Sequence, residues 1–461
     1  MHSSTHPSRA WLHGLMAALL FALLVWFSGQ PISGLAPYYH DFKDIILHGF
    51  NASAAGAATP TFPMWGYGWL LVITENSALL LAIQFVGALG ALVVLLHTAV
   101  TYDYASARAA RLAWCLLLSS LPWYATHLNA YSASSVGSSL LGISTALWLR
   151  ALRNRNGIYT NLIGAGAMFG LALNFRSDFY LLPLAFAALM SWLVSGTLVQ
   201  RMKRTLVWLT SCYGMLLPWM LYTNATVGHP LLTSTNAGHV MFIGLGNLPG
   251  NCWGITPIDS DPTMATEIRR HFGTAKSSLV YESDKFLQKR FRELVLHGPG
   301  EYIKKCAYVA GTQVIDGFYS GVFDQEYRAR IRANYPWQST TWILLHDPWI
   351  FMKECRLVTF LALLSELQAR LLLLASLLAA AILLRPAWQE CNPLILVALV
   401  SVSYQLLLNV TIGYQRVYVN NQLMFLMILL AIMWDRRPRQ QQRKGRNEMA
   451  PPVRIGFVEP E

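Results

Sequence analysis

The segment 37–44 concentrates side chains that can do acid–base chemistry. It reads Pro-Tyr-Tyr-His-Asp-Phe-Lys-Asp and follows a long apolar run. Asp41 and Asp44 are three residues apart, so on a short helix they would share a face. Either carboxylate is a candidate general base that takes a proton from an acceptor hydroxyl or amine while phosphate leaves. Tyr39 and His40 are the neighbouring candidates for substrate contact.

Both carboxylates also have a purely structural interpretation. Asp44 can pair with Lys43, and Asp41 can pair with Arg176, without any role in chemistry. The sequence leaves these alternatives open.

Two arginines supply the complementary chemistry. Arg176 lies in Leu-Ala-Leu-Asn-Phe-Arg-Ser-Asp (171–178), and Arg416 lies in Gly-Tyr-Gln-Arg-Val-Tyr (413–418). Cations at a membrane edge are costly and are usually paired or functional, and the planar guanidinium matches phosphate oxygens. We therefore expect an anionic lipid headgroup here, with Asp178 either touching the substrate or simply pairing with Arg176.

The composition places these residues in a membrane protein. The chain has 461 residues, of which 54% are hydrophobic and 13% charged, and a mean hydropathy of +0.38. These values are typical of an all-α polytopic membrane protein and exclude an ordinary soluble globule. The net charge of +12 resides largely in short connections and in the tail, which indicates topology and lipid contact and not nucleic-acid binding.

The apolar runs predict about ten transmembrane helices, because each needs roughly 20 apolar residues to cross the bilayer. Nine Lys and Arg residues in short connections lie on one side and three, Lys43, Arg176 and Arg416, on the other. The positive-inside bias then predicts cytoplasmic N- and C-termini in the cell inner (plasma) membrane, with the site on the extracytoplasmic face. The expected runs are 11–28, 77–100, 109–128, 132–152, 157–174, 179–199, 206–223, 363–384, 393–410 and 419–434.

Four regions follow from this topology. Residues 1–224 form an N-terminal transmembrane module whose first outer loop, 29–76, carries the candidate acids. Residues 225–362 form a small, mainly helical extracytoplasmic cap, with apolar residues near helical spacing at 286–295. Residues 363–435 hold the C-terminal transmembrane helices, and the basic tail 436–461 is expected to be disordered.

The six cysteines show no metal-ligand spacing. Three of them fall in the predicted cap, where one disulfide is possible without a defined pairing. Glycines 164, 166 and 170 are expected to serve close helix packing.

Several short motifs resemble a known family. They are Pro-Thr-Phe-Pro-Met-Trp-Gly (60–66), Gln-Phe-Val-Gly-Ala-Leu-Gly (84–90), Gly-Leu-Ala-Leu-Asn-Phe-Arg (170–176) and Gln-Arg-Val-Tyr (415–418). Together they resemble the polyprenyl-phosphate-sugar-dependent glycosyltransferases of the GT-C fold. The branch is the bacterial one related to protein O-mannosyltransferases and to the aminoarabinose transferase of lipid A.

The resemblance implies an inverting transfer of a hexosyl or pentosyl group. The sugar would leave a polyprenyl-phosphate carrier for a glycolipid, polymer or protein acceptor. Asp41 or Asp44 would be the base, and Arg176 and Arg416 would hold the carrier phosphate, with Tyr418 and Lys43 nearby. In that family an acid precedes a tyrosine, whereas here Tyr38 and Tyr39 precede Asp41, so the choice between the two acids stays open.

A cofactor is not expected. Arginines alone can handle a monophosphate leaving group, whereas a pyrophosphate would favour a divalent cation held by several carboxylates. The first outer loop has only two close acids before Glu75, so a metal-independent enzyme is the favoured prediction and a divalent cation the alternative.

Two other classes of function compete with the enzyme. A transporter or flippase for a lipid-linked glycan would also place basic residues near headgroups, but it should show inverted repeats and charges near mid-membrane. A non-catalytic assembly subunit would not need Asp41 or Arg416. The sequence shows no repeat between its halves, and its distinctive charges lie at one face, which favours the glycosyltransferase.

Overall fold

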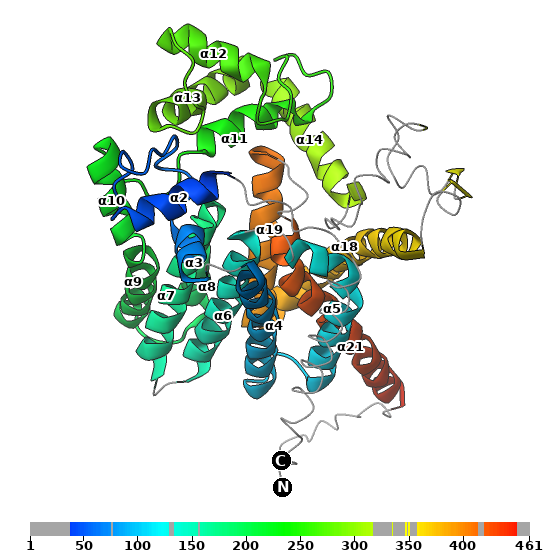
Figure 1. The fold of residues 1–461 in the computed structure, drawn as a ribbon. Helices are drawn as coiled ribbons and strands as arrows, with labels where there is room; N and C mark the ends of the chain where they lie inside the picture. The colour runs from blue at the N-terminus through cyan, green and yellow to red at the C-terminus, as the bar shows by residue number, and fades with distance from the viewer. Residues whose placement is uncertain are drawn as a thin grey trace, which may run out of the picture.

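The protein is all-helical in the part that the structure describes (Figure 1). A computed structural model describes residues 37–74, 77–128, 133–154, 157–316, 334, 346–347, 349–350, 357–413 and 419–449. No strand occurs among these residues. The predicted all-α class is therefore confirmed for the described chain, and the first expected apolar run, 11–28, lies outside it.

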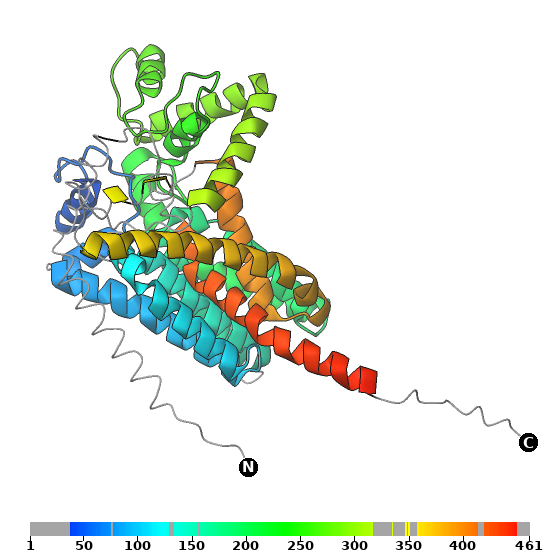
Figure 2. The same ribbon diagram turned by 90° about the vertical axis from the view of Figure 1, so that its right-hand side faces the viewer.

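A bundle of long helices forms the larger part of the molecule (Figures 1 and 2). Eight of the nine apolar runs expected within the described ranges overlap one main helix each, and the ninth, 206–223, overlaps two. The bundle helices are α4 (Ser77–Thr101), α5 (Ala107–Leu128), α6 (Ala133–Arg153), α7 (Ile158–Phe175), α8 (Leu182–Leu193), α9 (Leu198–Gly214), α10 (Leu217–Val227), α18 (Leu357–Glu390), α19 (Pro393–Thr411) and α21 (Leu423–Met449).

Four helices in the described ranges are long and apolar enough to cross a membrane. The qualifying segments are Leu79–Thr101, Ile158–Phe175, Leu367–Glu390 and Pro393–Thr411. Two of the helices expose apolar stripes at helical spacing. On α4, Leu79, Val86 and Val93 are exposed, and α18 exposes Leu371, Leu374, Leu378 and Ile382. Such continuous apolar surface is typical of a membrane protein.

Two of the expected spans are interrupted. The run 179–199 contains the short helix α8, which ends at Leu193, and then the first residues of α9. The 3-10 turn η2 (Ser177–Phe179) lies at its start. The run 206–223 is divided between α9 and α10. Proline stands in the first turn of both α8 and α10. Proline lacks the backbone N–H that a continuing helix needs, but it suits the start of a helix, so a new helix begins at each proline. The prediction of one uninterrupted helix over 206–223 was wrong for this reason.

Close helix packing explains the glycines of α7. A methyl group at Gly166 would lie 2.5 Å from Cβ of Ser211 on α9, and one at Gly170 would overlap the carbonyl oxygen of Cys212. Small residues let helix backbones approach in this way. The expected packing role is confirmed for Gly166 and Gly170, whereas a methyl group at Gly164 would make only an ordinary contact, 3.5 Å from Cδ1 of Leu147.

A smaller layer of helices covers one end of the bundle (Figure 1). We call its helices the cap: α11 (Ala237–Gly244), α12 (Pro262–Phe272), α13 (Tyr281–His297) and α14 (Pro299–Asp316), with the 3-10 turn η3 (Leu245–Asn247). Phe242, Ile255, Ile268 and Leu287 form its own hydrophobic core. The apolar residues expected at helical spacing in 286–295 lie in or against this core.

The first described segment lies between the cap and the bundle. Helix α2 (Pro37–Leu47) packs against α3 (Gly66–Thr74), and α3 packs against α4 and α7. Phe42 and Ile45 of α2 are fully buried, and the ring of Phe42 lies 5.9 Å from those of Trp219 and Tyr222. The segment with the candidate acids is therefore a packed helix at the end of the bundle that the cap covers.

Two expectations concern the tail and the cysteines. Helix α21 continues to Met449 and so covers the first part of the tail, 436–461; the disorder expected of the tail stays a prediction. Of the three cysteines expected in the cap, Cys252 and Cys306 are free thiols, and Cys355 lies outside the described residues.

Candidate functional site

Arg176 lies at the turn where α7 ends on the cap side of the bundle. It is the residue after the last residue of α7, and its backbone is extended, with φ −139° and ψ 94°. Its Nε and Nη2 donate to the two carboxylate oxygens of Asp178 at 2.8 and 2.6 Å, and Nη1 donates to Oγ of Ser134 at 2.7 Å. Both charged side chains are mostly buried, at 14% and 16% exposed. Of the two alternatives stated for Asp178, pairing with Arg176 is present in the structure, and substrate contact stays a prediction.

A glycine on α6 makes room for the arginine stem. A methyl group at Gly137 would lie 2.7 Å from Cγ of Arg176 and 3.3 Å from its Cβ. Gly137 belongs to the small-residue segment that opens α6, and Ser134 of the same segment accepts a hydrogen bond from the guanidinium. The start of α6 is therefore shaped around this one side chain.

The start of α3 and the residue before it contact the end of α7. Nε1 of Trp65 donates to Oδ1 of Asn174, and Nδ2 of Asn174 donates to the carbonyl oxygens of Gly170 and Met215 at 2.8 and 3.2 Å. A methyl group at Gly66 would meet the Asn174 carbonyl oxygen at 2.7 Å. These contacts fix the residue two positions before Arg176 and connect it to the segment that follows α2.

One buried amide side chain, on α19, contacts the ion pair, and further buried amides lie on α19 and on the turn before α21. Gln405 Nε2 lies 3.5 Å from Oδ2 of Asp178, and Asn409 Nδ2 donates to Oε1 of Gln313 at 3.2 Å. The 3-10 turn η4 (Asn420–Gln422) consists of three more buried amides and packs against α6, α19 and α21. Gln405, Asn409, Asn421 and Gln422 are each at most 2% exposed.

These amides are incompletely hydrogen-bonded. Oε1 of Gln405, Oδ1 of Asn409 and both polar atoms of Asn421 and Gln422 have no hydrogen-bond partner among the described residues. A buried polar atom without a partner costs about 1–3 kcal/mol, and native structures contain few of them. We call Arg176, Asp178, Gln405, Asn409, Asn421 and Gln422 the polar cluster. Its open donors and acceptors suit a ligand that carries both kinds of polar group.

The candidate acids lie on α2, at the same end of the bundle. Asp41 is half-buried and Asp44 is exposed. Helical spacing places Asp41 beside Ile45, at the edge of the buried face, and Asp44 on the other side of the helix. Neither carboxylate forms an ion pair with a described residue, so the proposed pairings of Asp41 with Arg176 and of Asp44 with Lys43 are absent from the described part. Lys43 is half-buried. The structure describes only the backbone of Tyr39 and His40.

Arg416 and Tyr418 lie outside the described residues, but both flanks of their segment are fixed. Before it, Nζ of the fully buried Lys305 donates to the carbonyl oxygens of Val410, Thr411 and Ile412 at 2.8, 3.2 and 3.4 Å. An ammonium there complements the negative end of the α19 dipole, and burial lowers the pKa of Lys305 to about 8. After the segment comes η4 of the polar cluster.

The cap is tied directly to this end of the bundle. Oγ of Ser177 lies 3.3 Å from Oγ of Ser234, Thr235 shares a 2.7 Å hydroxyl hydrogen bond with Thr61, and Thr235 Oγ1 donates to the Leu279 carbonyl at 2.6 Å. One short strap, residues 234–235, thus joins the Arg176 turn, the segment before α3 and the loop that precedes α13.

Among the described residues, no group of three or more His, Cys, Asp or Glu side chains is arranged to hold a metal ion. The chemistry that the described side chains offer is anion binding by a preoriented arginine, hydrogen bonding by buried amides and proton transfer by the α2 carboxylates.

Sequence reasoning missed the amides. Asn420-Asn421-Gln422 directly precede an apolar run, and three consecutive amides at the edge of a membrane helix were a usable signal. Gln405 and Asn409 lie within an apolar run, four residues apart and hence on one helix face.

Comparison with known proteins assigns no family. No family model, no curated protein and no solved structure matches this chain.

Proposed function

We propose that this protein is a membrane glycosyltransferase. It moves a sugar from a polyprenyl-phosphate carrier to a glycolipid, polymer or protein acceptor with inversion at the anomeric carbon. In this proposal the chain has about ten membrane spans in a GT-C-like arrangement, cytoplasmic termini and an extracytoplasmic site in the cell inner (plasma) membrane.

The observation that carries the proposal is the polar cluster buried at one end of an apolar bundle. A lipid-linked sugar has an apolar tail, an anionic phosphate and a ring of hydroxyls. The apolar stripes on α4 and α18 suit the first, the Arg176 guanidinium the second, and the unpartnered amides the third, because each hydroxyl both donates and accepts.

The Arg176–Asp178 pair has a defined place in this proposal. Asp178 holds the guanidinium plane in position through two hydrogen bonds, and preorganised donors stabilise developing charge without reorganisation at the moment of reaction. Asp178 is thereby a positioning residue, and Arg416, with Tyr418 and Lys43, adds to the phosphate contacts.

The reaction balances without a cofactor. The acceptor oxygen or nitrogen forms a bond to the anomeric carbon, the bond from that carbon to the phosphate oxygen breaks, and its electron pair leaves on the phosphate. The acceptor proton passes to Asp41 or Asp44. The negative charge that appears on the phosphate is stabilised by the arginines.

The test is sugar transfer by the purified full chain in lipid nanodiscs, with a panel of polyprenyl-phosphate sugars. We expect Asp41→Asn or Asp44→Asn to lower kcat by about 10²-fold or more, the usual worth of a general base. Arg416→Ala and Arg176→Lys should raise the donor KM, because lysine keeps the charge but loses the planar fork.

Two matched controls lie at the opposite end of the bundle. Asp103 is exposed with φ 57°, a conformation that asparagine tolerates, so Asp103→Asn should transfer at the wild-type rate. Exposed Arg111 serves likewise as Arg111→Gln. Unimpaired transfer by all four site variants would refute the site, and carrier translocation without transfer would replace the enzyme by a flippase.

A further inference from the structure

A pocket of about 700 Å³ opens on the cap between α12 and α13. Six of its lining residues come from one stripe of α13, at positions 282, 285, 286, 289, 290 and 293, which are spaced for a single helix face. The end of α12 supplies the rest. The volume lies within the range of small-ligand pockets, about 300–1,000 Å³.

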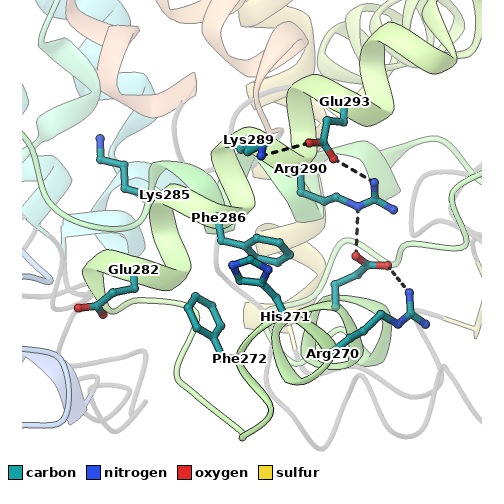
Figure 3. A pocket seen from close by; sticks show the side chains of 10 residues that line it. Arg270, His271, Phe272, Glu282, Lys285, Phe286, Lys289, Arg290 and Glu293 are labelled. Atoms are coloured by element: carbon teal, nitrogen blue, oxygen red, sulfur yellow. Dashed lines mark hydrogen bonds and ion pairs between the residues drawn. The ribbon is translucent and has the colours of Figure 1, made fainter.

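One wall of the pocket is aromatic (Figure 3). The imidazole of His271 stacks on the ring of Phe286, with centroids 4.2 Å apart and planes 11° apart. Phe272 meets both rings edge-on, at 4.6 and 5.9 Å. His271 is exposed, so this wall offers a flat ring surface at the opening of the pocket.

The other wall is a chain of alternating charges. Glu267 accepts from Arg270 at 3.2 Å and from Arg290 at 3.1 Å, and Glu293 accepts from Arg290 at 3.1 Å and lies 4.0 Å from Lys289. The dashed contacts in Figure 3 trace this chain. Burial acts to lower the pKa of Arg290, but its hydrogen bonds and charge interactions with Glu293 and Glu267 raise that pKa overall.

This charge pattern selects among ligand classes. An anion would meet Glu267, Glu282 and Glu293, and a cation would meet Arg270, Lys285, Lys289 and Arg290. A neutral polyhydroxylated molecule avoids both conflicts, since each hydroxyl can donate to a carboxylate and accept from a neighbouring guanidinium. Its apolar ring face can lie on the aromatic wall.

We propose that this pocket binds a neutral saccharide segment of the acceptor, away from the reacting end. The proposal rests on the proposed function only for the identity of the saccharide as an acceptor. The strap at 234–235 connects the Arg176 turn to the loop before α13, so a glycan held on α13 has a fixed position relative to the polar cluster.

The experiment measures saccharide binding directly, without donor or transfer. Neutral oligosaccharides are titrated into the full chain in nanodiscs and followed by saturation-transfer difference NMR, with phosphorylated and sulfated oligosaccharides in parallel. We expect the neutral ligands to bind and His271→Ala to weaken them about three- to tenfold, the value of one aromatic contact. His271→Phe should retain binding because it keeps a ring.

The charged wall has a matched pair of variants. Arg270→Ala removes a pocket donor, whereas Arg269→Ala removes an exposed arginine one residue away that does not line the pocket. Only the first should weaken binding. No binding of neutral saccharides, preference for the charged ones, or equal binding by wild type and His271→Ala would each overturn the proposal.

Failure of this proposal and failure of the proposed function are distinguishable. Saccharide binding that depends on His271, in a protein that transfers no sugar, would support the saccharide pocket and refute the glycosyltransferase. Transfer without saccharide binding would do the reverse. Where both hold, His271→Ala should raise the KM for long acceptors with kcat unchanged, and leave short acceptors unaffected.

Discussion

Gly137→Ala is the most specific perturbation of the candidate site, because it moves Arg176 without removing any charge. The added methyl would lie 2.7 Å from Cγ of Arg176, whereas carbon atoms pack best at about 3.5–4.0 Å. The guanidinium cannot easily yield, since Asp178 and Ser134 hold it by three hydrogen bonds. Either the arginine shifts by about 1 Å or α6 and the α7 turn separate.

The expected cost is that of overpacking, about 1–3 kcal/mol. If the shift weakens phosphate contact by about 1.4 kcal/mol, the donor KM rises roughly tenfold. The assay combines thermal unfolding in nanodiscs with donor KM and kcat from sugar transfer. We expect a higher donor KM, with the KM for the acceptor unchanged.

Two other glycines separate site effects from general overpacking. Gly166→Ala places a methyl 2.5 Å from Ser211 Cβ, between α7 and α9, and should lower stability without changing the donor KM. Gly90→Ala meets nothing within 4 Å and should be neutral or stabilising by up to about 1 kcal/mol. Equal loss of stability for Gly137→Ala and Gly166→Ala, with wild-type donor KM in both, would refute the role given to Arg176.

Three further predictions concern the surroundings of the site. Asn421→Leu should raise the free energy of unfolding of the unliganded protein by about 1–3 kcal/mol, because neither polar atom of the buried amide has a hydrogen-bond partner in the described part of the chain. It should also lower transfer, and a loss of stability would contradict this prediction. Burial lowers the pKa of Lys305 from 10.5 to about 8, so the unfolded chain binds more protons between these values and wild-type stability should rise with pH across that window. The rise in the free energy of unfolding is at most about 3 kcal/mol, and Lys305→Met should remove it. Thermal unfolding at pH 7.5 and 9.5 measures the difference, and identical pH dependence of wild type and variant would contradict the prediction. Trp65→Phe removes the hydrogen-bond donor to Oδ1 of Asn174 and should lower the free energy of unfolding by about 1–3 kcal/mol. Thermal unfolding measures this loss, and unchanged stability would contradict the prediction.

The fold was predictable where hydrocarbon alone sets the length of a helix. The expected runs 77–100, 157–174 and 393–410 end within a few residues of α4, α7 and α19, because nothing within them competes with helix. The runs 179–199 and 206–223 are less regular because a new helix starts at Pro183 and at Pro218. Hydropathy alone does not predict where such a helix starts. Span count and topology stay predictions beyond the four qualifying helices.

The candidate site was predictable only in part. Arg176 was found because a cation is rare at that end of the chain's helices, and its pairing with Asp178 was among the stated alternatives. The contribution of Ser134 and Gly137 depends on how α6 crosses the α7 turn, and tertiary packing of this kind leaves no local signal. Neutral amides carry no charge signal, so Gln405 and Asn409 were passed over inside their apolar run.

The most direct measurement is photo-crosslinking of the full chain in nanodiscs with a polyprenyl phosphate that carries a photoreactive group beside the phosphate, followed by peptide mapping. We predict labels at the start of α6, at residues 176–178 and at 420–422, competed by unlabelled carrier and reduced in Arg176→Lys. Labelling confined to other regions, or labelling that neither competitor nor the Arg176 variant reduces, would contradict the assignment of a carrier-phosphate site to the polar cluster.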